Sequence, residues 1–184
     1  MMRSLIFHGM LSWPMVTGAG RGGGWRLMAG VCGWLGVSGV GVACEAGVPQ
    51  GEVVEVRTTA YTHTEASHLR YGTRNAVGER LRYGKVRSAA ADWSRYPLGT
   101  RFRILGQPEE YVIDDYGSAL VGKNTIDLYK PTVRSMDQWG VRHLEIEVIE
   151  WGCFEESLEV LLPRAGKARH VAAMVRDLRA KAKG

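Results

Sequence analysis

Acidic residues are absent from the first 43 of the 184 residues, although the rest of the chain contains 19 of them. The basic residues of this first segment are Arg3, Arg21 and Arg26. Without them the chain is nearly neutral, so its net charge of +5 gives little support for a nucleic-acid partner. Only three cysteines are present, too few for a disulfide framework. The chain also lacks internal repeats, and its composition is that of an ordinary globular domain, which excludes collagen-like and disordered chains.

A long apolar run is present only near the N-terminus, where the uncharged stretch from Leu27 to Ala43 follows Arg26. A positive flank, an apolar stretch and small residues at its end are typical of a secretory signal. We therefore expect residues 1–43 to be a signal peptide, residues 44–52 a linker, and the mature protein to be exported to the periplasm or outer membrane. Two alternatives are an uncleaved anchor, for which the run is short, and a lipoprotein signal that attaches the protein to the membrane through lipidated Cys44.

The mature chain has many short runs rich in β-branched residues, separated by glycine and proline turns. The expected strands are residues 53–61, 87–91, 100–105, 110–113, 125–129 and 142–151. A single helix is expected between them, at residues 131–139. This pattern predicts a mainly β protein that closes into a small barrel. Residues 62–84 show no periodicity and are expected to form a long surface loop, which in a compact domain is commonly functional.

The C-terminal segment, residues 152–184, is predicted to contain a strand at residues 157–162 and a helix at residues 167–181. The helix has apolar residues at the i, i+3, i+4 and i+7 positions, so one of its faces should pack on the domain. These residues are Val171, Met174, Val175 and Leu178. Its other face is basic and is expected to be solvated; attraction to anionic envelope polymers is the alternative.

Strand alternation near residue 127 gives the first chemical indication. Ile126 and Leu128 share one face of the predicted strand, and Asp127 and Tyr129 share the other. If the apolar pair enters the barrel core, Asp127 faces a groove or solvent. In a partly apolar groove beside a tyrosine, desolvation raises the pKa of a carboxyl group, so Asp127 could hold a proton for a sugar oxygen. The alternative is an ordinary exposed strand aspartate.

Three ordered segments resemble the 3D domain, a family named for three aspartates that includes the C-terminal part of membrane-bound lytic transglycosylase A. They are Thr59-Ala60-Tyr61-Thr62, then Ala90-Ala91-Asp92 with Pro97-Leu98-Gly99-Thr100, and finally Asp115 to Gly122 with Ile126-Asp127-Leu128-Tyr129. The resemblance covers residues 53–151. It implies a six-stranded double-psi β-barrel and cleavage of peptidoglycan glycan strands.

The resemblance also implies site residues. Asp92, Asp115 and Asp127 match the three family aspartates, and Asp127 falls at the position of the catalytic acid. The family usually has a lysine where this chain has Val121, and Lys123 is the cation nearby. The candidate substrate-binding residues are Tyr61, Gly117, Ser118, Lys123 and Tyr129. Tyr61 could stack on a sugar or could simply be an aromatic residue at the end of the barrel.

The implied reaction is that of a lytic transglycosylase, in which a single carboxyl group acts first as acid and then as base. We expect a monomer that acts on peptidoglycan without metal or cofactor and has no nucleic-acid partner. The first alternative is a non-catalytic peptidoglycan-binding module with the same groove. The second is a metal site built from the three aspartates with His63 or His68, although their spacing matches no metal motif.

Overall fold

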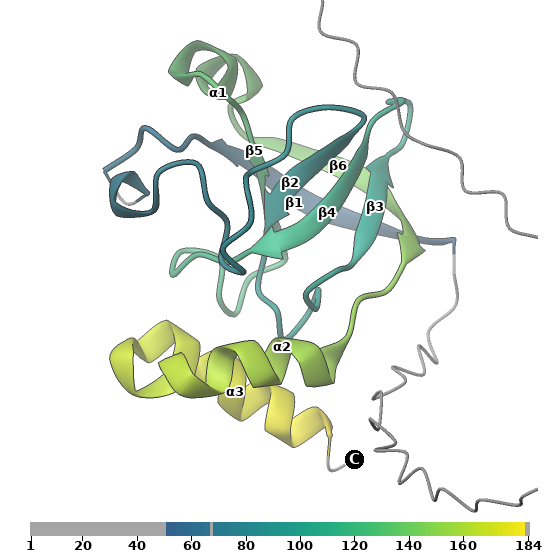
Figure 1. The fold of residues 1–184 in the computed structure, drawn as a ribbon. Coiled ribbons are helices and arrows are strands. Elements are labelled where there is room, and N and C mark those ends of the chain that lie inside the picture. Colours follow the sequence, from purple (N-terminus) through teal and green to yellow (C-terminus); the bar gives the residue numbers. More distant parts are fainter. Residues whose placement is uncertain (1–50, 67, 183–184) are drawn as a thin grey trace, which may run out of the picture. The chain divides into compact units, whose positions relative to one another are not determined.

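The computed structural model describes residues 51–66 and 68–182, so the predicted signal peptide and Cys44 lie outside the described residues. The described part contains six strands that close into one barrel (Figure 1). They are β1 (Glu52–Tyr61), β2 (Val86–Ala90), β3 (Arg101–Ile104), β4 (Glu110–Asp115), β5 (Thr125–Tyr129) and β6 (Arg142–Glu150). The predicted six-stranded barrel is confirmed, and each strand expected between residues 53 and 151 is present.

The strands follow the order β1-β5-β2-β4-β3-β6 around the barrel. The pairs β1·β5 and β2·β4 are parallel, and the other neighbours are antiparallel. Alternate residues point inward, so β5 buries Ile126 and Leu128 completely while Asp127 between them is only half-buried. This arrangement confirms the alternation predicted for this strand.

The short helix α1 (Val133–Trp139) confirms the helix expected at residues 131–139. It begins at Thr132, whose hydroxyl accepts a hydrogen bond from the Ser135 N–H at 3.2 Å, while the Ser135 hydroxyl accepts one from the Thr132 N–H at 3.3 Å. It ends at Gly140, where the backbone takes a φ of 61° that favours glycine. In Figure 1, α1 lies at the end of the barrel opposite the other two α-helices.

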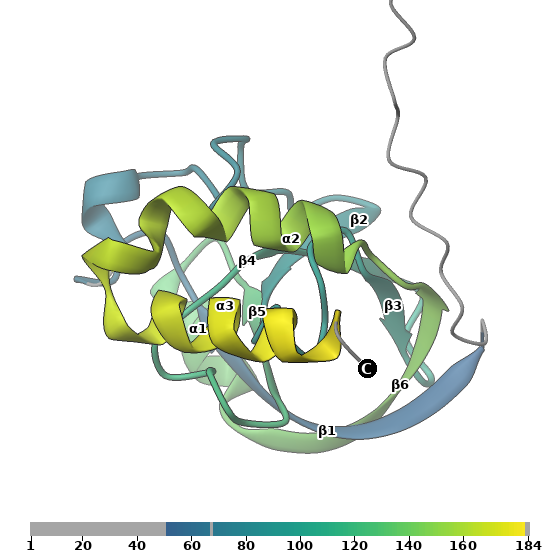
Figure 2. The same cartoon turned by 90° about the horizontal axis from the view of Figure 1, so that it is seen from below.

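The C-terminal segment forms α2 (Phe154–Leu161), the 3-10 helix η2 (Leu162–Lys167) and α3 (Arg169–Lys181). Figure 2 shows α2 and α3 side by side across one end of the barrel. The predicted terminal helix is confirmed, and its apolar residues Val171, Met174, Val175 and Leu178 are buried in the main core. No helix within the described ranges is long and apolar enough to span a membrane.

The strand predicted at residues 157–162 is wrong, because this segment lies in α2 and the start of η2. A short apolar run is compatible with either structure, and its surroundings decide between them. Cys153 begins the helix, since its Sγ accepts a hydrogen bond from the Glu156 N–H at 3.3 Å. Ser157 and Leu161, four residues apart and therefore on one helical face, are both buried.

Gly152 joins β6 to α2 at a point where two backbone segments nearly touch. A Cβ at this position would lie 2.0 Å from the Leu98 carbonyl oxygen and 2.5 Å from the Thr100 nitrogen. We expect Gly152→Ala to lower the free energy of unfolding by about 1–3 kcal/mol or more, because the clash is with backbone. Gly166→Ala is the control, since its Cβ would meet nothing within 4 Å. Equal denaturant midpoints for the two variants would contradict this account of the junction.

Candidate active site

Two of the predicted aspartates lie on either side of one β2 residue. Ala90 pairs with Asp115 on the parallel strand β4 and with Asp127 on the antiparallel strand β5. On its other side, Asp127 pairs with Thr59 of β1. The barrel therefore brings Asp115 and Asp127 together across a single intervening strand.

An irregularity in β4 orients the two adjacent aspartates of that strand. Ala89 pairs with Ile113 but Ala90 pairs with Asp115, so Asp114 is an extra residue in the ladder. Under strict alternation, Asp115 would point to the same side as Ile113, which is fully buried in the apolar core. The bulge removes this constraint and lets both carboxyl groups find polar partners.

Asp115 is a buried carboxyl group that accepts a hydrogen bond at each of its oxygens. Its Oδ2 accepts a hydrogen bond from the Tyr61 hydroxyl at 3.2 Å, and its Oδ1 accepts one from the Tyr116 N–H at 2.9 Å. Burial raises the pKa of Asp115 to about 7, and the charges of Asp114 and Asp127 act in the same direction. Asp115 is therefore able to gain or lose a proton near neutral pH.

Asp127 is the more accessible of the pair. Its Oδ1 accepts a hydrogen bond of 2.7 Å from the Thr59 hydroxyl. Burial raises the pKa of Asp127 to about 6, the Thr59 hydrogen bond and Arg57 oppose this effect, and Glu65 adds to it. Thr59 belongs to the first of the three sequence motifs but is not among the predicted site residues.

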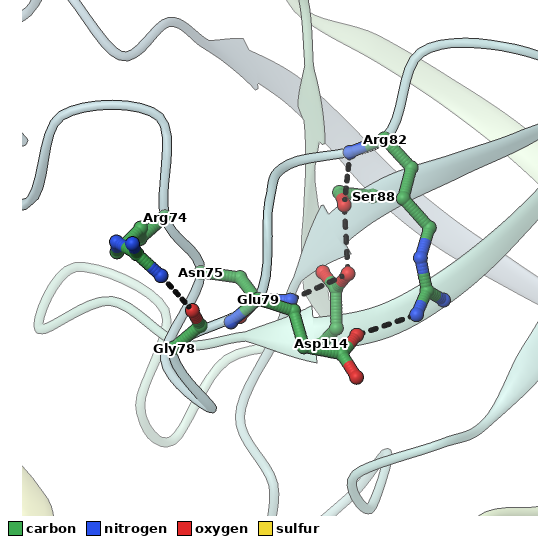
Figure 3. Close-up of polar contacts among 7 residues, drawn as sticks. All are labelled: Arg74, Asn75, Gly78, Glu79, Arg82, Ser88 and Asp114. Carbon is green, nitrogen blue, oxygen red and sulfur yellow. Dashed lines mark hydrogen bonds and ion pairs between the residues drawn. The ribbon is translucent and has the colours of Figure 1, made fainter.

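Asp114 is the centre of a polar network that attaches the loop before β2 to the barrel (Figure 3). Its Oδ2 accepts hydrogen bonds from the Ser88 hydroxyl at 2.7 Å and the Asn75 amide at 3.0 Å. Asn75 in turn accepts from the Glu79 N–H, and Ser88 from the Arg82 N–H. Burial raises the pKa of Asp114 as well. The sequence does not reveal this network, because an aspartate before a turn is typically satisfied by nearby backbone.

Asp92 has a different setting from Asp115 and Asp127. It is 1% exposed, its Oδ1 accepts from the N–H and hydroxyl of Ser94, and its Oδ2 accepts from the Gly122 N–H at 2.7 Å. It lines a pocket of about 510 Å³ together with residues of α3. Within the described residues, the hydrogen bonds of Asp92 join two loops and do not reach Asp115 or Asp127.

The predicted sugar-contacting tyrosines lie next to each other on β1 and β5. The rings of Tyr61 and Tyr129 are 5.6 Å apart, and both are buried in a small cluster that also contains Leu81, Ala90 and Leu120. The Tyr129 hydroxyl lies 2.9 Å from Nδ1 of His63. In this structure Tyr61 supports Asp115 through its hydroxyl group, and its ring is largely covered.

The other predicted substrate-binding residues lie in the loop between β4 and β5. Ser118 and Lys123 are exposed and Gly117 is half-buried. Leu120 of the same loop is buried against Tyr61 and Tyr129, so the loop borders the site. Val121, where the resemblance leads one to expect a lysine, packs against the main core. The roles of Gly117, Ser118 and Lys123 in binding stay predictions.

The metal alternative finds no support in the described residues. No group of three or more histidine, cysteine, aspartate or glutamate residues within residues 51–66 and 68–182 could hold a metal ion. His63 contacts Tyr129, and the ring of His68 lies 5.6 Å from that of Tyr61. Both histidines are thus part of the aromatic surroundings of the carboxyl groups.

The fold and the site define a small mixed β-barrel domain with buried carboxyl groups of raised pKa beside one strand. Residues 87–150 match the 3D domain family, so this part of the chain is a 3D domain. This family is found in lytic transglycosylases related to membrane-bound lytic transglycosylase A. The match begins within β2 and ends with β6, so β1 and the loop after it lie outside the match. No curated protein matches the chain.

Burial of Asp115 predicts a defined pH dependence of stability. Its pKa rises from 3.8 to about 7 on folding, so the stability that its protonated form contributes is complete below pH 4 and is lost as the pH rises through 7. Because Asp115→Asn has no charge to bury, we expect its melting temperature relative to wild type to increase from pH 4 to pH 8.

The control for this measurement is Asp137→Asn, which changes an exposed aspartate of α1. Its melting temperature should follow the wild-type pH profile. Parallel profiles for wild type and Asp115→Asn would contradict the raised pKa of Asp115.

Proposed function

We propose that this chain is an exported lytic transglycosylase that cleaves the β-1,4 bond between N-acetylmuramic acid and N-acetylglucosamine in peptidoglycan. The observation that carries the proposal is Asp127, a half-buried carboxyl group with a pKa raised to about 6 on the polar side of a barrel strand in a 3D domain. General acid catalysis needs a carboxyl group that keeps a proton near the working pH and lies within reach of a substrate.

In the proposed mechanism, the Thr59 hydroxyl occupies Oδ1 of Asp127, which leaves Oδ2 to exchange a proton with the substrate. Asp127 donates its proton to the glycosidic oxygen as the bond from that oxygen to C1 of muramic acid breaks. The 6-hydroxyl of the same muramic acid then bonds to C1 and returns its proton to Asp127. The products are a 1,6-anhydro sugar and a new 4-hydroxyl group, and no water is consumed.

Asp127 is a better candidate for this acid than Asp115. Asp115 is only 7% exposed and uses both oxygens to accept hydrogen bonds from Tyr61 and Tyr116. The charge of Asp127 contributes to the raised pKa of Asp115, so Asp115 stays protonated while Asp127 ionises. We therefore assign Asp115 and Asp92 positioning roles, Asp115 beside the acid and Asp92 through the loops that it joins.

The proposed location is the cell envelope, to which residues 1–43 would direct the protein. The proposed enzyme is a monomer that acts on peptidoglycan and has no nucleic-acid partner, metal or cofactor.

A non-catalytic peptidoglycan-binding module is the second candidate function. It is favoured by Val121, which packs against the core at the position where the family usually has a lysine. Cleavage measurements separate the two functions.

Asp127→Asn tests the catalytic assignment, because it keeps the size of the side chain but removes the transferable proton. We expect cleavage to fall by about 10²–10⁴-fold. Because burial raises the pKa of Asp127, the variant should be at least as stable as wild type above pH 6, so the loss of cleavage cannot come from unfolding. Muropeptide mass spectrometry should detect 1,6-anhydro ends with wild type and with the control Asp137→Asn. Near-normal cleavage by Asp127→Asn would reject Asp127 as the acid.

The nature of the wild-type products tests the reaction itself. Only free reducing ends would indicate hydrolysis instead of transglycosylation. Retention in the peptidoglycan pellet without any cleavage would favour the binding module.

A general acid with a pKa of about 6 predicts that activity declines as the pH rises above 6. The hydrogen bond from Thr59 favours the charged form of Asp127, so Thr59→Val should raise the pKa of Asp127 and move this decline to higher pH. Thr59→Ser keeps a hydroxyl group and should restore the wild-type profile. The measurement is the cleavage rate against pH, and an unchanged profile for Thr59→Val would contradict the assigned role of this hydrogen bond.

A further inference from the structure

Five aromatic rings form a continuous series past the candidate active site. In order they are Tyr71, His68, Tyr61, Tyr129 and Tyr83, and successive ring centroids lie 5.8, 5.6, 5.6 and 6.3 Å apart. The inner pair, Tyr61 and Tyr129, is buried beside the carboxyl groups. The outer tyrosines are much more accessible, at 49% for Tyr71 and 43% for Tyr83. This aromatic series therefore has two exposed ends, one on either side of the Tyr61–Tyr129 pair.

Each exposed end also carries a cation. The guanidinium carbon of Arg70 lies 4.6 Å from the centre of the Tyr71 ring, and that of Arg87 lies 4.6 Å from the centre of the Tyr83 ring. Arg70 is exposed, whereas Arg87 is half-buried and also pairs with Glu109 at 2.8 Å. The same pair of groups, a tyrosine ring and an arginine, thus occurs at both ends of the aromatic series.

The segment that carries most of these rings is attached firmly to the barrel. Residues 62–66 and 68–84 run between β1 and β2 (Figure 1). The Asp114 network holds this segment in its middle (Figure 3), and Leu81 is buried in the cluster with Tyr61 and Tyr129. All of its residues precede the matched residues 87–150, so the family match does not account for it. A fixed loop can present its side chains to a ligand with little loss of conformational entropy.

The chemistry of the two ends selects among possible ligands. A sugar ring has apolar C–H faces that can pack on a tyrosine, and a guanidinium group binds carboxylates in a planar, two-pronged geometry. A neutral glycan would use only the rings, whereas a glycan that bears carboxylates would use the rings and the arginines. Peptidoglycan is a glycan of the second kind.

We propose that the Tyr71–Arg70 and Tyr83–Arg87 pairs, at the two exposed ends of the aromatic series, are the end subsites of a binding track for the glycan strand, and that these subsites favour carboxylate-bearing glycan over neutral glycan. The identity of the polymer rests on the function proposed above. The preference for carboxylates rests on the arginines alone, so it can be tested without cleavage.

The test is co-sedimentation of the full-length protein with three insoluble polymers: peptidoglycan, peptidoglycan whose carboxyl groups have been converted to amides, and chitin. Arg70→Gln should weaken binding to untreated peptidoglycan by up to about 5-fold, the range of an exposed ion pair. Its binding to the amidated polymer and to chitin should stay at the wild-type level. Arg87→Gln should show the same selectivity. Because this variant also loses the ion pair with Glu109, a thermal melt checks that it is still folded. Tyr71→Ala and Tyr83→Ala should weaken binding to all three polymers.

The matched control is Arg169→Gln, which changes an exposed arginine of α3 and should bind all three polymers as wild type does. Wild-type binding by Arg70→Gln, or an equal loss on peptidoglycan and chitin, would overturn the proposed subsites. If the selectivity is found but no cleavage occurs, the transglycosylase proposal fails and the binding track stands. If cleavage occurs but none of the four variants changes binding, the binding track fails and the transglycosylase proposal stands.

Discussion

The burial of carboxyl groups beside β2 is the constraint on which the rest of the candidate site depends. An ionised carboxylate loses hydration when it is buried, so each such group must be neutral or accept hydrogen bonds. Asp115 accepts two hydrogen bonds and Asp127 one, and burial still raises the pKa of both. The protein thus stabilises these groups enough to bury them and leaves them able to carry a proton.

The segment that follows β2 also holds Asp115 in place, through a hydrogen bond to its backbone. The Trp93 indole N–H donates a hydrogen bond of 2.9 Å to the Asp115 carbonyl oxygen, and the Trp93 ring lies edge-on to Tyr116 at 5.0 Å. Asp92 fixes the turn that carries Trp93 by accepting two hydrogen bonds from Ser94. Asp92 therefore affects the site only through the turn that carries Trp93, and for this reason we assign it a positioning role.

Local patterns in the sequence predict much of this fold, and tertiary pairing decides the rest. Alternation in β5 correctly placed Ile126 and Leu128 inside the barrel and Asp127 outside, because the period of two is a local property. The bulge at Asp114 could not be predicted, since it exists only in the pairing of β4 with β2. For the same reason, the sequence shows neither that Ala90 separates the two acids nor that Thr59 donates to one of them.

The helix at residues 154–161 shows that local sequence, besides leaving strand pairing open, can leave the type of secondary structure open. A short apolar run is compatible with a strand or a helix, and here the cap at Cys153 and burial against α3 determine the outcome. The role of Tyr61 could not be predicted from its residue type either. Its aromatic ring suggests a sugar contact, but the hydrogen bond from its hydroxyl group to Asp115 is visible only in the folded barrel.

The site also depends on residues outside the matched domain. Thr59 and Tyr61 come from β1, so residues 87–150 alone would leave Asp127 and Asp115 each without one of their hydrogen-bond donors. From the other end of the chain, Lys181 of α3 donates a hydrogen bond of 2.5 Å to the Ser94 carbonyl oxygen, in the turn that positions Trp93. β1 therefore supports the two carboxyl groups directly, and α3 supports Asp115 indirectly through the turn that carries Trp93. The geometry of the carboxyl groups thus depends on described elements outside the matched segment as well as on that segment.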